Sequence, residues 1–173
     1  LVGSEMCIRD STNVGWMGAV ADGKTSGVID SRNAIEALSL SVNWYRRGGS
    51  ISSRAHVSGV GWQSWSSGAV GTTGQSRSIE AVQFKLNGEI SATYGIWYRV
   101  YASKLGGWLG WTSNGSPAGS VGKGAAIQGV QILLVEKSGS APGDTLNHFI
   151  GATDVLSGSS LGLNGKSLGS VQG

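Results

Sequence analysis

A Gly-Trp pair occurs three times in this chain of 173 residues, at positions 15–16, 61–62 and 107–108, and successive pairs are 46 residues apart. Each pair is followed by a glycine-rich turn, and an apolar stretch begins eight residues after the last glycine of that turn. These stretches begin at Ile35, Ile79 and Ile127. A fixed period of this length is typical of supersecondary units that bury little surface alone and share a core once assembled. The chain is therefore expected to contain three related units, and its function is expected to depend on what they display together.

Strands are predicted on both sides of each Gly-Trp pair. Hydrophobic and polar residues alternate in Val82-Gln-Phe-Lys-Leu86 and its counterparts, and a period of two is typical of a strand with one buried face. A second strand leads into the tryptophan at residues 54–57 and 97–101, which are rich in β-forming side chains. The 30 glycines suit a turn-rich β protein, because glycine adopts positive φ without steric cost.

Three such units predict an all-β body with pseudo-threefold symmetry. Closing the units around a common axis would remove most exposed strand edges. We expect a β-prism-like or β-trefoil-like body over residues 12–150, with units at about 12–48, 49–93 and 94–143, and an open three-unit array is the alternative. Residues 151–173 are rich in Ser and Gly and predict a linker or frayed tail, because such a sequence loses more entropy on ordering than burial returns.

The N-terminal segment has a different origin from the repeats in our interpretation. Residues 1–10 match, in order, the conceptual translation of a transposon-type sequencing adapter. We therefore set residues 1–11 aside as an adapter artefact, so that Cys7 is expected not to belong to the protein. The first unit is then expected to have lost its leading strand, and covalently linked domains upstream of Ser11 are expected to have been lost by truncation. The segment is no signal peptide, because it lacks a basic start and a long apolar run.

Composition argues against several classes of function. The net charge is +3, the basic residues are scattered and Arg46-Arg47 is the only basic doublet, so nucleic-acid binding is not expected. Membrane insertion is not expected either, since no apolar run approaches the roughly 18 residues of a membrane helix. The two histidines, His56 and His148, are isolated, so we expect no metal and no cofactor. No serine lies in a context that would expose a nucleophile, and no catalytic residue is expected.

Several stretches carry a resemblance to a known family. Residues 59–65 read Gly-Val-Gly-Trp-Gln-Ser-Trp, and residues 78–86 read Ser-Ile-Glu-Ala-Val-Gln-Phe-Lys-Leu. Matching stretches in the third unit occupy residues 94–102, 107–115 and 135–143. Over about residues 13–143 the chain resembles the clostridial hydrophobic repeat with a recurring Trp, called ChW. The resemblance implies a secreted or cell-surface protein of Gram-positive anaerobes, with a role in surface attachment, polysaccharide binding or protein binding, and it implies no reaction.

The units depart from one another at three positions of the family pattern. The His before the Trp is His56 in the second unit, and Tyr101 stands there in the third. The Glu of the apolar stretch occurs as Glu36 and Glu80, and the third unit has Gln128. A second Trp occurs as Trp65 and Trp111, and the first unit has Ala19. If His, Glu and the second Trp form one site, the middle unit alone carries all three.

The tryptophans of the units divide into two groups. Trp16, Trp62 and Trp108 recur in every unit, and we expect them to pack in the shared core near the axis, with the indole N–H bonded to neighbouring backbone. Trp65 and Trp111 lie three residues further on, an odd step that points to the opposite face of an extended strand. We expect these two side chains to form an outer platform that stacks on sugar rings. Packing under a loop or against the next unit is the alternative.

The expected ligand-binding residues are Trp65, Trp111, His56, Gln63 and Glu80. For Glu36 and Glu80 the alternative is structural, because a carboxylate there could accept N–H groups of the glycine-rich turn. A glycosidase would need two carboxylates roughly 5 to 10 Å apart, and no pair is singled out. The sequence therefore predicts a non-catalytic extracellular or cell-surface binding module for a polysaccharide or cell-surface glycoprotein. The alternatives are an accessory domain of a truncated surface hydrolase and a structural envelope protein that binds other proteins.

Overall fold

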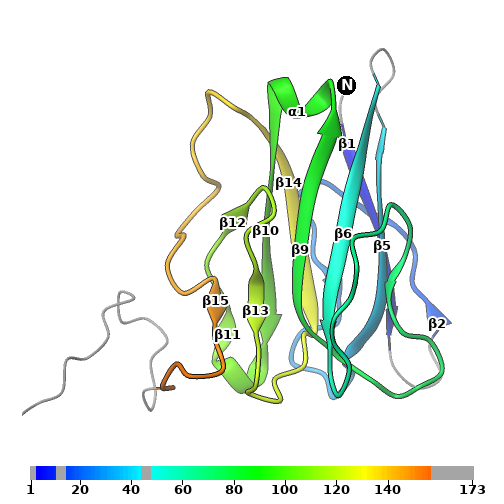
Figure 1. Cartoon of the computed structure of the whole chain (residues 1–173), viewed down its shortest axis with the longest axis vertical. Coiled ribbons are helices and arrows are strands. Elements are labelled where there is room, and N and C mark those ends of the chain that lie inside the picture. The colour runs from blue at the N-terminus through cyan, green and yellow to red at the C-terminus, as the bar shows by residue number, and fades with distance from the viewer. Residues whose placement is uncertain (1–2, 11–14, 44–47, 157–173) are drawn as a thin grey trace, which may run out of the picture.

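Strands joined by turns and loops make up the part of the chain described by a computed structural model, which covers residues 3–10, 15–43 and 48–156 (Figure 1). The described residues include one short helix, α1 (Ile90–Thr93), and one 3-10 turn (Ser103–Leu105). The prediction of an all-β fold is confirmed.

The three units follow one plan, in which two long strands enclose two or three short ones. The first unit comprises β1 (Gly3–Asp10), β2 (Gly15–Trp16), β3 (Val20–Ala21), β4 (Ser26–Gly27) and β5 (Ile35–Asn43). The second comprises β6 (Gly49–Val57), β7 (Gly61–Trp62), β8 (Val70–Gly71) and β9 (Ile79–Gly88). The third comprises β10 (Tyr94–Ala102), β11 (Gly107–Trp108), β12 (Thr112–Ser113), β13 (Ala118–Ser120) and β14 (Gly129–Glu136). The last strand, β15 (Phe149–Ile150), lies beyond the third unit.

Strand pairing links the units in a cycle. The long strands pair antiparallel within each unit, β1 with β5, β6 with β9 and β10 with β14, and Figure 1 shows them running along the long axis of the molecule. Each pair then receives a short strand from another unit: β8 of the second unit joins β5, β13 of the third joins β9, and β4 of the first joins β14. The described strands therefore form three sheets, each built from two units, and no single closed barrel.

A glycine stands at each of these three exchange pairings. The glycines are Gly27, Gly71 and Gly119, with φ values of 102°, 93° and 116°. A Cβ built on them would overlap the carbonyl oxygens of Gln128, Glu36 and Glu80, respectively. Positive φ and a close approach of two backbones both require glycine here. The recurring glycine-rich turns thus have a structural purpose, which is to let one unit lie directly on the backbone of another.

The first unit has a strand in the leading position. We expect this unit to lack one, yet β1 pairs with β5 from Gly3↔Asn43 to Arg9↔Ala37, as β6 pairs with β9. Without a neighbouring strand, the edge of β5 would expose unpaired backbone N–H and C=O groups. The extended segment β1 forms hydrogen bonds with these groups. The assignment of residues 1–11 to an adapter stays a prediction.

One hydrophobic cluster joins the three units. Aliphatic side chains fill most of it, and the Phe84 and Tyr98 rings meet edge to face with centroids 4.8 Å apart. The expectation that Trp16, Trp62 and Trp108 fill this core is wrong. Trp16 is 46% exposed, and the other two indoles are only partly buried. The core excludes them because Phe84, Tyr98 and the inward-facing aliphatic residues already occupy the shared interior.

Candidate binding site

The outer face of the middle unit carries an arginine between two tryptophans. On β6, Ala55 and Val57 are fully buried, so the alternate residue Arg54 faces outward. Its guanidinium carbon lies 4.9 Å from the Trp62 ring centroid and 5.2 Å from that of Trp65. Each cation–π contact of this kind contributes about 0.5–2 kcal/mol, depending on exposure. We call Trp62, Arg54 and Trp65 the middle stack.

The third unit repeats the arrangement with Trp108, Arg99 and Trp111. The guanidinium carbon of Arg99 lies 4.6 Å from the Trp108 centroid and 4.9 Å from that of Trp111. Burial lowers the pKa of Arg99. The two tryptophans of a unit therefore share one face, and the expectation that they lie on opposite faces is wrong. The odd-step rule fails because β11 ends at Trp108 and the next residues do not continue as a strand.

A glutamine holds each arginine in place. Gln83 lies opposite Arg54 on β9, and its Oε1 accepts a hydrogen bond from the arginine Nε–H. Its Nε2 donates to the carbonyl of Gly115 in the third unit, at 2.7 Å. In the third unit Gln131 bonds Arg99 at 2.7 Å and Thr25 of the first unit at 2.8 Å. Each stack is thereby tied to the turn of a neighbouring unit.

Neither the two arginines nor the two glutamines were predicted from the sequence, although a signal for them exists. Arg54 stands two residues before His56, and Arg99 stands two residues before Tyr101. Alignment of the second long strands, which begin near Ile79 and Ile127, brings Gln83 onto Gln131. An arginine that recurs with two tryptophans and a facing glutamine would have indicated a shared stack.

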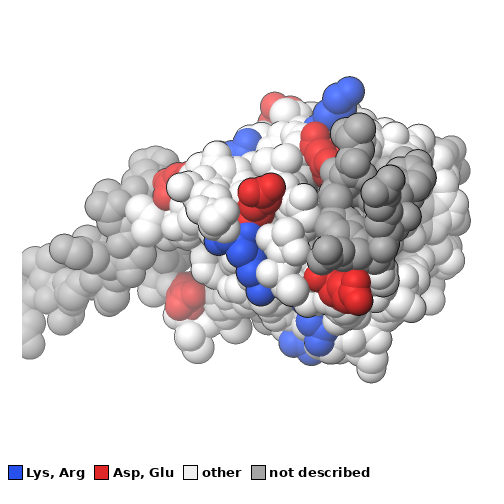
Figure 2. Space-filling view, turned by 90° about the horizontal axis from the view of Figure 1, so that it is seen from above, with Lys and Arg blue, Asp and Glu red and all other residues white. Residues whose placement is uncertain are grey.

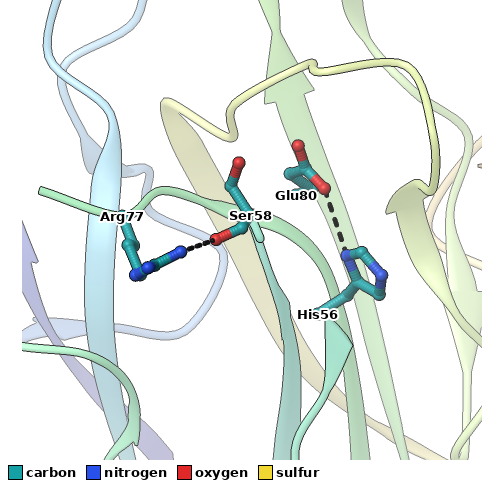
Figure 3. A network of polar contacts seen from close by, with 4 residues as sticks. All are labelled: His56, Ser58, Arg77 and Glu80. Carbon is teal, nitrogen blue, oxygen red and sulfur yellow. Dashed lines mark hydrogen bonds and ion pairs between the residues drawn. The ribbon is translucent and has the colours of Figure 1, made fainter. Parts of the chain in front are cut away.

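His56 and Glu80 meet where β6 lies beside β9 (Figure 3). The His56 Nδ1 lies 3.1 Å from Glu80 Oε2, with side chains 14% and 8% exposed. The imidazole also meets the Trp62 ring edge to face, with centroids 5.5 Å apart. A carboxylate this deeply buried requires such a partner. The prediction that His56 and Glu80 belong together in the middle unit agrees with this geometry, and the pair lies where it fixes the Trp62 ring.

The third unit replaces this pair with groups that do not form an ion pair. Tyr101 meets Trp108 edge to face at 5.4 Å and donates its hydroxyl hydrogen to Asp30. Gln128 accepts a hydrogen bond from the Ser103 N–H at 2.9 Å. The middle unit thus differs from the third in the chemistry that supports its first tryptophan.

Gln63 and Glu36 both form hydrogen bonds with the backbone of the glycine-rich turn of the middle unit, Gln63 through its side-chain amide and Glu36 through its own backbone carbonyl. The Gln63 Nε2 donates to the Gly71 carbonyl at 3.0 Å, and its Oε1 accepts from the Gly71 N–H at 2.7 Å. At Glu36 the backbone carbonyl, and not the carboxylate, accepts from the turn, through the Thr72 N–H at 2.8 Å. The amide of Gln63 therefore stabilises the turn of its own unit, which is a structural role.

Trp111 is covered, so the expectation that it forms an exposed platform is wrong. It is 6% exposed, and its backbone N–H donates to the carbonyl of Asp144 at 2.7 Å. A Cβ on Gly143 would lie 3.1 Å from the indole Cδ1 and Nε1, and a Cβ on Gly110 would lie 2.8 Å from the carbonyl carbon of Leu146. We call residues 142–146 the strap. It follows β14 at the end of the third unit and has no counterpart within the repeat period, so the spacing of the units could not reveal it.

No segment among the described residues covers Trp65 in this way, and its side chain is only partly buried. The residue before it is Ser64, where the third unit has Gly110, and a side chain at this position would collide with a strap that approached as closely. The Trp65 ring has the Lys85 Nζ 4.2 Å from its centroid and Gly115 of the third unit beside it. The middle stack is therefore the accessible one of the two.

The comparison with known families identifies the same two units that carry the stacked arginines. A family model described as Clostridial hydrophobic W, ChW, matches residues 56–88 and 106–136. Two segments of the chain are thus similar to ChW repeats. The matched segments correspond to the second and third units, and each runs from the tryptophan pair to the second long strand. ChW repeats are found in surface-associated proteins. The search of curated proteins and the search of solved structures each found no match.

Charge does not gather into one region on the side of the molecule seen in Figure 2. Lys and Arg atoms lie there in small separate groups, with Asp and Glu atoms among them. Within residues 3–10, 15–43 and 48–156, no three His, Cys, Asp or Glu side chains are grouped as metal ligands, and no helix is long and apolar enough to cross a membrane.

Proposed function

We propose that this chain is a non-catalytic, surface-associated binding domain whose middle ChW repeat binds a saccharide, on a polysaccharide or a glycoprotein. The observation that carries the proposal is the middle stack. Two large aromatic rings lie outside the core, on one face, and no part of the chain that the structure describes covers them as the strap covers Trp111. Indoles held at a surface offer flat apolar area with a polar edge, which suits the apolar face and hydroxyl rim of a sugar ring.

The supporting residues take distinct parts in this proposal. Trp65 is the contact residue, and Arg54 holds it beside Trp62. The His56 ring contacts the Trp62 indole, and Glu80 pairs with His56. Because both side chains are largely buried, they have a positioning role. The strap makes Trp111 structural, so one binding site for each domain is expected.

The cyclic strand exchange supports a pseudo-threefold, β-prism-like arrangement. The pairings of β8 with β5, β13 with β9 and β4 with β14 repeat one geometry at three joints. In such an arrangement the outer faces of the three sheets point away from a common core, and a stack on one face is presented to large ligands without obstruction.

Affinity electrophoresis in gels that contain single polysaccharides tests the proposal. The domain should be retarded by at least one plant or bacterial cell-wall polysaccharide, and Trp65→Ala should abolish the retardation while leaving the unfolding midpoint close to the native one. Trp16→Ala is the matched control, because Trp16 is an exposed indole in a unit without an arginine or a second tryptophan at the equivalent positions. No retardation on a broad panel, or equal retardation of the Trp65→Ala variant, would contradict saccharide binding.

Protein binding is the second candidate. Exposed aliphatic residues outside the middle stack, at Val28, Ile29 and Val60, suit a protein partner better than a sugar. Failure of the polysaccharide panel would make this the leading function. The intact gene upstream of Ser11 decides whether a hydrolase accompanies the repeats.

A further inference from the structure

We propose that the saccharide bound by the middle repeat carries an oxyanion, which Arg54 and Lys85 recognise beside Trp65. This inference rests on the proposed function and names the chemical class of its ligand. The oxyanion is a carboxylate, phosphate or sulfate group on the sugar chain.

Arg54 has donors to spare. Its Nε–H is bonded to Gln83, and no other residue that the structure describes accepts a hydrogen bond from its terminal nitrogens. The glutamine fixes the plane of the guanidinium, and the two tryptophans hold it from both sides. A planar guanidinium with free terminal N–H groups matches the two oxygens of a carboxylate or phosphate.

Lys85 adds a second cation to the same ring. Its Nζ lies 4.2 Å from the Trp65 centroid. Across the described ranges of the chain, no ion pair joins Arg54 or Lys85 to a carboxylate, so neither cation is neutralised. Two cations at one aromatic ring repel each other, and an anionic ligand would remove that repulsion while it gained two charge-assisted contacts.

The third repeat provides an internal comparison. Its arginine, Arg99, is stacked in the same way, but Leu133 stands at the position of Lys85. Both residues lie two positions after the glutamine that bonds the arginine, and they pair with Ser52 and Trp97 on the adjacent long strand. The second cation thus occurs in the repeat whose stack is open and is absent from the repeat whose stack the strap covers. This coincidence links the cation pair to binding rather than to the fold of the repeat.

The test uses two forms of one polymer, polygalacturonate and its methyl-esterified derivative, which differ in whether the carboxyl groups are charged. Isothermal titration of the whole domain should show binding to the acidic form and at least tenfold weaker binding to the ester. A poly(glycerol phosphate) chain and inorganic phosphate form two further arms, which distinguish a carboxylate ligand from a phosphate ligand.

Two lysine variants separate recognition from general attraction. Lys85→Leu, which installs the residue of the third repeat, should weaken binding of the acidic polymer by about fivefold to tenfold and reduce its salt dependence. Lys137→Leu removes the same charge at an exposed position after β14 and should change affinity less than twofold. Equal losses in the two variants would overturn the proposal in favour of non-specific attraction.

The remaining outcomes distinguish this inference from the proposed function. Equal, Trp65-dependent binding of the acidic and esterified polymers would overturn the oxyanion proposal and leave saccharide binding standing. No binding of any saccharide polymer in the electrophoresis panel or in the titrations would overturn both.

Discussion

The exchange joints provide the sharpest test of the fold, and Gly71 and Gly61 form a matched pair for it. Both belong to the middle unit, and their φ values are 93° and 94°. A Cβ on Gly61 meets nothing within 4 Å, whereas a Cβ on Gly71 would lie 2.8 Å from the Cα of Ala37 and would overlap the Glu36 carbonyl oxygen. Substitution by Ala therefore introduces the same backbone strain at both sites and a steric collision at one.

The free energies expected for the two variants differ clearly. Positive φ costs a non-glycine residue about 1–2 kcal/mol, and Gly61→Ala should lose that amount. Gly71→Ala must also move β8 away from β5, which breaks the hydrogen bond from Thr72 to Glu36 and uncovers part of Val70. A lost hydrogen bond costs about 0.5–1.5 kcal/mol and exposure of a valine about 1.5–3 kcal/mol, so the total should be about 3–6 kcal/mol.

Equilibrium unfolding in urea, followed by tryptophan fluorescence, measures both variants under one set of conditions. Gly18→Ala is the baseline, because Gly18 has no positive φ and an open environment. If Gly71→Ala and Gly61→Ala lose the same stability within about 0.5 kcal/mol, the two backbones do not approach each other at this joint and the reasoning is refuted.

Three further predictions concern single residues. Trp62→Ala should lower the free energy of unfolding by only about 1–2 kcal/mol, because the indole lies outside the core and its removal eliminates chiefly the contacts with Arg54 and His56. A loss of about 3–5 kcal/mol would instead indicate that Trp62 is a core residue. Gly110→Ser should displace the strap and expose Trp111, seen as stronger iodide quenching and a red shift of fluorescence, whereas unchanged quenching would show that the strap tolerates a side chain there. Burial raises the pKa of Tyr98 far above its usual value near 10, so the neutral phenol favours the folded state: that contribution is complete below pH 10 and lost as pH rises further. An absorbance titration should therefore show Tyr98 ionising only as the protein unfolds, and Tyr98→Phe should remove one late-titrating group.

The sequence was sufficient for the fold class because its signals are local. Alternation along Val82–Leu86 and the fixed spacing of the Gly-Trp pairs predict strands and three units without any knowledge of contacts. The sequence also indicated that the middle unit alone carries His, Glu and the second Trp together, but it did not predict that the His56 ring and the Glu80 carboxylate pair directly.

The placement of the tryptophans was not foreseen, because recurrence does not distinguish a core residue from a stacked surface residue. Trp62 recurs in order to cover an arginine, and the strand that bears it is too short for the odd-and-even rule. The burial of Trp111 depends on the strap, which returns from more than 30 residues away. Such a contact is tertiary and leaves no periodic trace.

The measurement that tests the account most directly is the indole N–H spectrum of the domain during titration with an acidic oligosaccharide. The chain contains seven tryptophans, and their indole signals can be assigned by substitution. The account predicts saturable shifts of the Trp65 signal and smaller shifts of the Trp62 signal, with the covered Trp111 unchanged. Shifts confined to Trp16 or Trp111, or no shift at concentrations that saturate retention in gels, would contradict binding at the middle stack.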